Sequence, residues 1–167
     1  MLLGIVSDTH DNLDHVHAAV GLFEAEGVDR VVHCGDVVAP FSAAPFDSDA
    51  FDFSAVRGNN DGEWALADVV DDFGTYHGEC AELRVDGVDI AVYHGTSEQL
   101  REALADSGAY DYVVHGHTHE RTVVDHGETV RVNPGGLPIP GADDAFHVAT
   151  LDTAQPGTEA VTHHQLK

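Results

Sequence analysis

The fold is decided first by the stretch Leu2-Leu3-Gly4-Ile5-Val6-Ser7-Asp8-Thr9-His10 at the start of the chain. Its apolar first half is short and rich in branched side chains, which is typical of a buried strand. The run stops at Asp8 and His10, two metal-binding side chains that stand two residues apart. In extended backbone, side chains two residues apart point the same way. The stretch therefore predicts a strand whose carboxyl end presents a metal-binding pair.

The same pattern returns four more times along the chain, each time as a short apolar run that ends at Asp, Asn or His beside a glycine. The runs and their followers are Val31-Val32 with His33-Cys34-Gly35-Asp36, Phe53 to Val56 with Gly58-Asn59, Ile90 to Tyr93 with His94-Gly95, and Tyr112 to Val114 with His115-Gly116-His117-Thr118-His119. In open α/β sheets, ligands bind in the crevice beyond the carboxyl ends of the strands. Each pattern alone is weak, but five strand ends together predict one polynuclear metal centre.

The segments between these runs predict a mixed α/β fold. Residues 11–26 carry apolar side chains at roughly helical spacing and end at Gly27, so the first two strands form a right-handed β-α-β unit. Further helices are expected over 64–70 and 97–106. Hairpins are expected around 86–87 and 126–128, and closing strands over 146–151 and 159–163. We predict a single α/β (mixed α+β) domain over residues 1–167, with two mixed sheets covered by helices.

The charge of the chain is strongly negative. Its 30 Asp and Glu side chains stand against 7 Lys and Arg, for a formal net charge of −23, and the sole lysine is Lys167. Nucleic acids and anionic membranes need clusters of basic side chains, so neither a nucleic-acid polymer nor a membrane is expected as a partner. Acids spread along the whole chain with almost no lysine favour a halophilic protein, with an ordinary acidic protein as the alternative.

The remaining composition excludes several classes of protein. An apolar content of 43% excludes a disordered chain. No apolar run approaches the ~20 residues of a membrane helix. No leader sequence is visible, so a cytoplasmic location is expected. Cys34 and Cys80 are too few for a disulfide framework, and both are expected to be buried as small apolar side chains.

The order of the motifs resembles the calcineurin-like metallophosphoesterase superfamily. Asp-x-His, Gly-Asp, Gly-Asn-x-Asp, His-Gly and Gly-His-x-His follow one another over essentially the whole chain. The length, the Arg57-Gly58-Asn59 context and Asn133-Pro134-Gly135 resemble its small single-domain branch of phosphodiesterases, to which a eukaryotic retromer subunit also belongs. The resemblance implies a four-layer αββα sandwich, in which two facing mixed β-sheets are flanked by helices.

Position by position, the resemblance implies two divalent metal ions bridged by one carboxylate. The first ion would be held by Asp8, His10, Asp36 and His119, and the second by Asp36, Asn59, His94 and His117. The expected catalytic residues are Asp36, Asn59, Asn60 and His94. Two such ions clamp the attacking and leaving oxygens of a phosphoryl displacement, and hydroxide held between them attacks phosphorus in line. Mixed nitrogen and oxygen ligands favour transition metals, with manganese first and nickel, iron, cobalt or zinc as alternatives.

Asn60 departs from the family pattern. The residue after the metal-binding Asn is commonly His in the superfamily and often Cys in the small branch, whereas an amide cannot transfer a proton at working pH. General acid catalysis contributes ~10²–10⁴-fold, so esters with acidic leaving groups are the expected substrates. Arg57 is expected to form a surface ion pair, with a contact to substrate phosphate as the alternative.

Three further side chains lie near the predicted ligands. Asp61 either orients His10 through a hydrogen bond or caps the helix that begins near Trp64. His33 and His115 lie within apolar strand ends. Both histidines are expected to be structural or to support the ligands from behind.

The function that these observations predict is hydrolysis of small phosphate esters, phosphodiesters in the first place, by a binuclear metal centre. The alternative is a non-catalytic metal-binding scaffold on the same fold, as in the retromer subunit. All seven motif positions carry side chains that can bind a metal, which favours the enzyme. Asn60 favours the scaffold, because an amide cannot act as a general acid. The sequence leaves homo-oligomerisation open.

Overall fold

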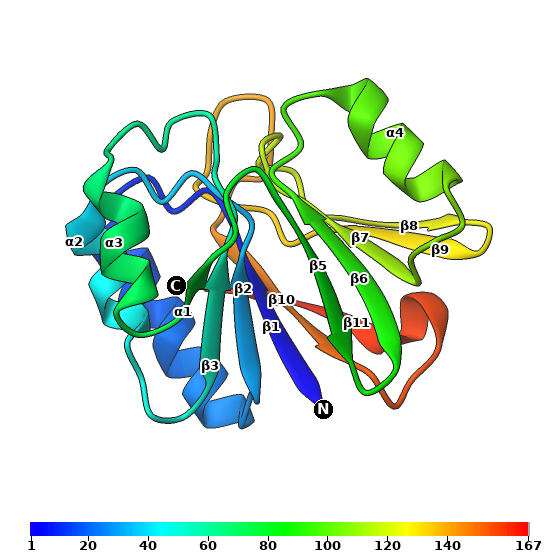
Figure 1. Ribbon diagram of the computed structural model, residues 1–167, viewed down its shortest axis with the longest axis horizontal. Helices are drawn as coiled ribbons and strands as arrows, with labels where there is room; N and C mark the ends of the chain where they lie inside the picture. The colour runs from blue at the N-terminus through cyan, green and yellow to red at the C-terminus, as the bar shows by residue number, and fades with distance from the viewer. Residues whose placement is uncertain (167) are drawn as a thin grey trace.

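The computed structural model describes residues 1–166, and Lys167 lies outside the described residues. Its strands are β1 (Leu2–Val6), β2 (Arg30–His33), β3 (Asp52–Ala55), β4 (Thr75–Tyr76), β5 (Cys80–Val85), β6 (Val88–Tyr93), β7 (Tyr112–Val114), β8 (Thr122–His126), β9 (Thr129–Asn133), β10 (His147–Asp152) and β11 (Val161–Gln165). They form two facing sheets, ordered β11-β10-β1-β2-β3-β4 and β5-β6-β7-β9-β8 (Figure 1). The predicted pair of sheets is therefore confirmed.

Both sheets are mixed. In the first, β1 to β4 run parallel, β10 is antiparallel to β1, and the edge strand β11 is antiparallel to β10. In the second, β6, β7 and β9 run parallel, and the edge strands β5 and β8 are antiparallel to their neighbours. Because β1, β2 and β3 are parallel neighbours, as are β6 and β7, their carboxyl ends open onto common sheet edges.

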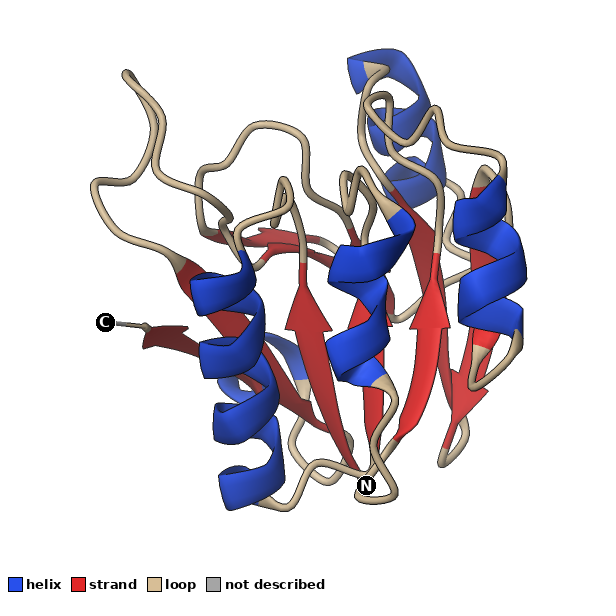
Figure 2. Cartoon of the chain, turned by 90° about the vertical axis from the view of Figure 1, so that its left-hand side faces the viewer, coloured by secondary structure: helices blue, strands red, loops and turns tan. Residues whose placement is uncertain are grey.

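Helices cover the outer faces of the sheets. They are α1 (Leu13–Glu26), α2 (Pro40–Ala43), α3 (Ala65–Asp71) and α4 (Glu98–Asp106), with the 3-10 turns η1 (Ala44–Phe46) and η2 (Gly157–Ala160). Figure 2 shows the first three helices side by side over the first sheet. On the second sheet, Ala105 of α4 packs against Ala91 and Val113. The predicted four-layer αββα sandwich is thus confirmed.

The alternation of side chains along β1 shows how the layers are held. Leu3 and Ile5 are fully buried between the two sheets. Val6 packs on the other side, in the core shared with α1. Gly4 also faces that side, where an added Cβ would lie 2.9 Å from the ring of Phe23. The glycine therefore lets α1 pack closely against the sheet.

The helix ends follow the signals in the sequence. Asn12 caps α1 by accepting a hydrogen bond from the backbone N–H of His15, so the helix begins two residues after the predicted start. Gly27 ends it with a φ of 69°, a left-handed conformation that a glycine adopts at no cost. Ser97 caps α4 in the same way as Asn12, through the N–H of Leu100.

Two expectations need correction, and one strand was not expected. Cys34 is buried, but Cys80 is exposed because the side chains of β5 alternate and its first residue points outward. The last strand starts at Val161 rather than 159, since the preceding residues form η2. The two-residue strand β4 was not anticipated, because a pair of residues carries no periodic signal.

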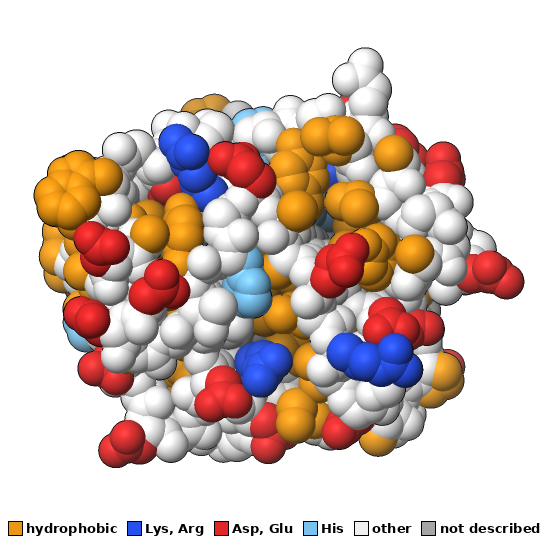
Figure 3. All heavy atoms as spheres, viewed as in Figure 1, with side chains coloured by type: hydrophobic (Ala, Val, Ile, Leu, Met, Phe, Trp, Pro, Cys, Tyr) orange, Lys and Arg blue, Asp and Glu red, His pale blue; other side chains and the backbone are white. Residues whose placement is uncertain are grey.

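The surface carries the predicted acidity. Figure 3 shows carboxylates scattered over the face in view, with few basic groups among them. Among residues 1–166, no helix is both long enough and apolar enough to cross a membrane. The acidic side chains are spread along the chain and are not collected in one segment.

Candidate metal centre

All seven predicted ligands lie in loops that follow the carboxyl ends of five strands. Asp8 and His10 follow β1, Asp36 follows β2, Asn59 follows β3, His94 follows β6, and His117 and His119 follow β7. The first three strands belong to one sheet and the last two to the other. The sandwich therefore brings the ligands together from both of its sheets.

Asp8, His10 and His119 form the first group of donors. The Nε2 of His119 lies 3.4 Å from Oδ1 of Asp8 and 3.3 Å from Nε2 of His10. Oδ1 of Asp8 is buried and has no hydrogen-bond partner among the described residues. A buried carboxylate oxygen without a donor is costly unless a cation neutralises it. These residues therefore fit a metal ion.

Asp36 lies between the first group and the second. Its Oδ2 is 3.5 Å from Nε2 of His10 and 3.4 Å from Nε2 of His94. On the far side of His94, Oδ1 of Asn59 lies 3.1 Å from its Nε2 and 2.9 Å from Nδ1 of His117. A carboxylate in this position can bridge two ions, as the resemblance implied.

Hydrogen bonds behind the ligands fix their orientation. Oδ2 of Asp8 accepts from the hydroxyl of Ser7 at 2.6 Å and from the N–H of His117 at 2.9 Å. Nδ1 of His94 lies 2.8 Å from the carbonyl oxygen of Cys34, and Nδ1 of His119 lies 2.6 Å from that of Leu137. Each imidazole thus turns Nε2 toward the centre, as metal-binding histidines commonly do.

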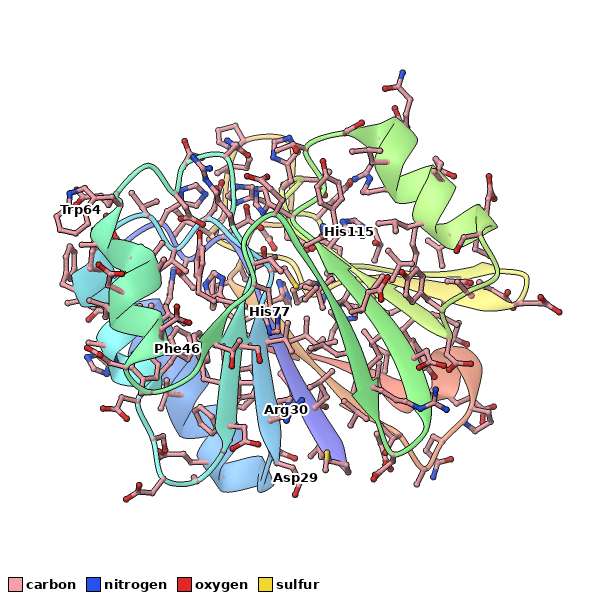
Figure 4. All side chains as sticks on the ribbon, viewed as in Figure 1. Asp29, Arg30, Phe46, Trp64, His77 and His115 are labelled. Carbon is pink, nitrogen blue, oxygen red and sulfur yellow. The ribbon has the colours of Figure 1, made fainter. Side chains whose placement is uncertain are left out.

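Both interpretations of Asp61 are wrong. Its carboxylate accepts three backbone N–H bonds, from Asp36, Val38 and Gly58, and so holds the loops that carry the ligands. The residue at the N-terminus of α3 is Trp64, which makes no capping bond and projects outward (Figure 4). Sequence spacing could not reveal this role, because two of the three partners are more than 20 residues away.

The backbone at the centre is strained. Five ligands adopt left-handed φ angles between 44° and 70°, namely Asp8, His10, Asp36, His117 and His119. This conformation is unfavourable for residues with a Cβ, and such residues concentrate at functional sites. The surrounding contacts must hold these residues in place.

Glycines make that close packing possible. An added Cβ at Gly58 would overlap the backbone N–H and the carboxylate of Asp36. At Gly116 it would overlap the hydroxyl of Ser7 and the carboxylate of Asp8, and at Gly136 it would lie 2.6 Å from Cβ of Asp8. The two central carboxylates are therefore enclosed by backbone, a further fit to a compact metal site.

The pKa values of the two carboxylates shift in opposite directions. Burial raises the pKa of Asp8 above its ordinary value. Burial would also raise the pKa of Asp36, but hydrogen bonds from His94 and Asn60 outweigh it and hold this pKa well below its usual range. Burial lowers the pKa of His94, yet Asp36 and Asp8 more than compensate, so the net shift is upward. The charges of the cluster are thus mutually dependent.

Asn60 donates two hydrogen bonds to Asp36. Its backbone N–H donates to Oδ1 of Asp36 at 2.8 Å, and its side-chain amide donates to Oδ2 at 2.7 Å. The amide therefore positions the central carboxylate. Arg57, nearby, pairs with Glu79 at 3.3 Å, which confirms the expected ion pair.

His33 and His115 are structural, as expected. Nδ1 of His33 accepts from the N–H of Gly35, and its Nε2 lies 3.1 Å from the hydroxyl of Thr9, so the ring joins the loops after β1 and β2. Burial lowers the pKa of His33 to about 3 and that of His115 to about 4. Both rings are therefore neutral at pH 7. His33 is the last residue of β2, and His115 begins the loop after β7.

Comparison with known proteins agrees with this geometry. A family model described as the calcineurin-like phosphoesterase superfamily domain matches residues 1–156. The chain belongs to this superfamily. The earlier resemblance is therefore confirmed, and the calcineurin-like phosphoesterase domain accounts for nearly the whole chain.

Individual members of the superfamily are also similar to this chain. A phosphodiesterase of Methanocaldococcus jannaschii is 34% identical over 145 residues, which cover 81% of this chain and 83% of the relative. The solved structure of an archaeal phosphodiesterase is 31% identical, with a TM-score of 0.89 over 99% of this chain and 100% of its own. Vps29 of Entamoeba histolytica in complex with zinc, at 15% identity and a TM-score of 0.69 over 99% and 98%, shows the fold alone. Family and relatives support a metal-dependent phosphoesterase.

Proposed function

We propose that this chain hydrolyses small phosphodiesters at a binuclear metal centre, with manganese as the preferred ion. The proposal is carried by Asp36, whose carboxylate lies between His10 on one side and His94 on the other. One ion would be held by Asp8, His10, Asp36 and His119, and the other by Asp36, Asn59, His94 and His117. Imidazole, amide and carboxylate donors together suit manganese and its neighbours better than calcium or magnesium.

The residues around the proposed ligands hold them in position to bind the ions and an anionic ester. Two divalent ions held by these ligands would polarise the phosphate and would supply a water molecule of lowered pKa as the nucleophile. Asp61 and the glycines keep the ligand loops in place, and His33 joins two of them. The side chain of Asn60 is committed to Asp36, so it offers no proton to a leaving group. We therefore propose aryl and other acidic leaving groups as the best substrates.

The surface narrows the substrate class further. A formal net charge of −23 repels long nucleic acids, whereas a mononucleotide ester or a cyclic nucleotide carries little charge to repel. The similar sequence from Methanocaldococcus jannaschii and the similar solved structure are both described as phosphodiesterases. Small diesters fit both observations. The acidic surface also supports our proposal that the protein works at high salt in the cytoplasm.

The test is hydrolysis of bis(p-nitrophenyl) phosphate with metal removed and restored. EDTA should abolish the activity and Mn²⁺ should restore it, with up to two equivalents of metal in elemental analysis. Asp36→Asn should lower kcat/KM by more than about 100-fold, because replacing even an outer partner of a metal ligand costs ~10–100-fold. Asp68→Asn, an exposed position on α3, is the matched control. Unchanged hydrolysis by Asp36→Asn contradicts the assignment.

The non-catalytic scaffold remains the second candidate, and Asn60 is the observation that favours it. A scaffold would bind metal through the same ligands but turn over no ester. Elemental analysis that shows two ions, together with no hydrolysis of aryl diesters in high salt, would decide for the scaffold.

A further inference from the structure

The basic residues of this chain are few, and nearly all of them are neutralised. Five of its six arginines each have a carboxylate oxygen within 4.0 Å: Arg30 with Asp52, Arg57 with Glu79, Arg84 with Asp89, Arg121 with Asp143, and Arg131 with Glu102. Within residues 1–166, Arg101 is the exception. An unpaired guanidinium is unexpected in a chain that has 30 acidic side chains.

The acids nearest to Arg101 along α4 do not neutralise it. Glu98 stands one turn earlier on the helix, a spacing that permits an ion pair, but its carboxylate is not within 4.0 Å. Glu102 is the next residue, and Arg131 binds it. Nε of Arg101 is buried without an acceptor among the described residues. Nε of Arg131 is unpartnered in the same way, although its Nη1 binds Glu102. What distinguishes Arg101 is that no carboxylate among the described residues neutralises it, so its charge is left for an anion from outside the chain.

Arg101 lies beside the metal centre. Its Cδ would be 3.3 Å from a Cβ built on Gly95, the residue after the ligand His94, and the same position is 3.3 Å from the carbonyl oxygen of Gly116. Gly116 precedes the ligand His117. Nδ1 of His115, a residue labelled in Figure 4, lies 3.4 Å from the Cβ position built on Gly95.

We propose that Arg101 binds a phosphate group of the substrate at the α4 side of the metal centre. A guanidinium presents several N–H donors in one plane and pairs with phosphate oxygens through two bonds at once. It would supply positive charge where the rest of the surface repels the substrate. The phosphate is either the one that is cleaved or a second one on the same molecule. The proposal rests on the proposed phosphodiesterase function.

The experiment compares Arg101→Gln and Arg101→Lys with Arg84→Gln. Arg84 is an exposed, paired arginine next to the turn between β5 and β6, so its removal changes the net charge equally, far from the ligands. The substrates are thymidine 5′-(p-nitrophenyl phosphate) and the same ester with an added 3′-phosphate, at fixed high KCl with saturating Mn²⁺. Inorganic phosphate binding is measured by calorimetry on the same metal-loaded proteins, which requires no turnover.

Loss of a charge-assisted hydrogen bond should raise KM about 10-fold in Arg101→Gln, with partial recovery in Arg101→Lys. An equal rise with both esters, together with weaker phosphate binding, places the cleaved phosphate at Arg101. A rise only with the added 3′-phosphate places the second phosphate there. KM and phosphate binding within about two-fold of Arg84→Gln in every arm overturn the proposal. If the wild type hydrolyses neither ester, the proposed function fails, and phosphate binding still decides the role of Arg101.

Discussion

The carboxylate of Asp61 accepts a hydrogen bond from the backbone N–H of Asp36, with its Oδ2 3.0 Å from the nitrogen. The same oxygen accepts from the N–H of Gly58 at 2.7 Å, and Oδ1 accepts from that of Val38 at 2.7 Å. One buried side chain therefore ties the loop after β2 to the loop after β3. These loops carry Asp36, the proposed bridging carboxylate, and Asn59, a proposed ligand of the second ion.

Asp61→Asn should destabilise the protein and weaken metal binding together. An amide turns an N–H₂ group toward backbone donors, so at least one buried N–H loses its acceptor, at a cost of about 3 kcal/mol for bonds to a charged group. Urea unfolding and metal content are the measurements, with Asp68→Asn as the control. Wild-type stability and metal content in Asp61→Asn would show that the two loops keep their conformation without the Asp61 carboxylate.

Gly116→Ala should remove the first metal ion. Its Cβ would overlap the Ser7 hydroxyl and the Asp8 carboxylate, so Asp8 must move away from its position against His119. Overpacking of this kind typically costs ~1–3 kcal/mol. Gly62→Ala is the control, because nothing lies within 4 Å of an added Cβ there. Elemental analysis that still finds two ions in Gly116→Ala would contradict the expected displacement.

The rate of ester hydrolysis should depend steeply on the pKa of the leaving group, because Asn60 donates to Asp36 and cannot protonate a leaving alkoxide. Asn60→His should flatten this dependence and accelerate alkyl esters by up to about 100-fold. Asn60→Ala separates the loss of the bond to Asp36 from the gain of an acid. Equal leaving-group sensitivity in wild type and Asn60→His would place this position off the path of the proton.

Stability should fall as the pH drops below about 6.5, the ordinary pKa of histidine. The pKa of His33 in the folded protein is lowered to about 3. Between this pKa and the ordinary pKa of about 6.5, the unfolded chain binds a proton at His33 and the folded chain does not. The stability from this neutral ring is complete above pH 6.5 and is lost as the pH falls toward 3, by on the order of 1 kcal/mol at pH 5.5. Urea unfolding of His33→Gln should show a weaker pH dependence, whereas His17→Gln, on the exposed face of α1, should keep that of the wild type.

Folding and activity should both increase with salt. At ~0.01 M ionic strength the Debye length is about 30 Å, and at ~1 M it is about 3 Å, so salt removes repulsion between distant carboxylates. Repulsion weakens a fold whose margin is only ~5–15 kcal/mol and slows the approach of an anionic ester. The thermal midpoint and kcat/KM are measured from ~0.1 to ~3 M KCl with saturating metal. Constant values over this range would show that the acidity has another cause.

Much of the centre could be predicted because its signals are local. The run from Leu2 to Val6 shows a strand by its composition, and Asp8 and His10 follow at once. Glycines and capping residues mark helix ends for the same reason, since Gly27 and Asn12 act on the residues next to them. What sequence reasoning missed lies at long range. Asp61 bonds to an N–H 25 residues away, and Gly116 matters because Ser7 occupies the space next to it.

The sequence by itself determined the set of candidate ligands, the strands that present them and the charge of the surface, because residue type and spacing fix these properties. Only the tertiary structure decided how the ligands meet. Asp36 lies between His10 and His94 because two sheets with separate strand orders face each other and turn their loops inward. The pairing of each arginine is also a property of the folded chain. Five lie against carboxylates, and Arg101 is left beside the metal centre by the packing of α4 on its sheet.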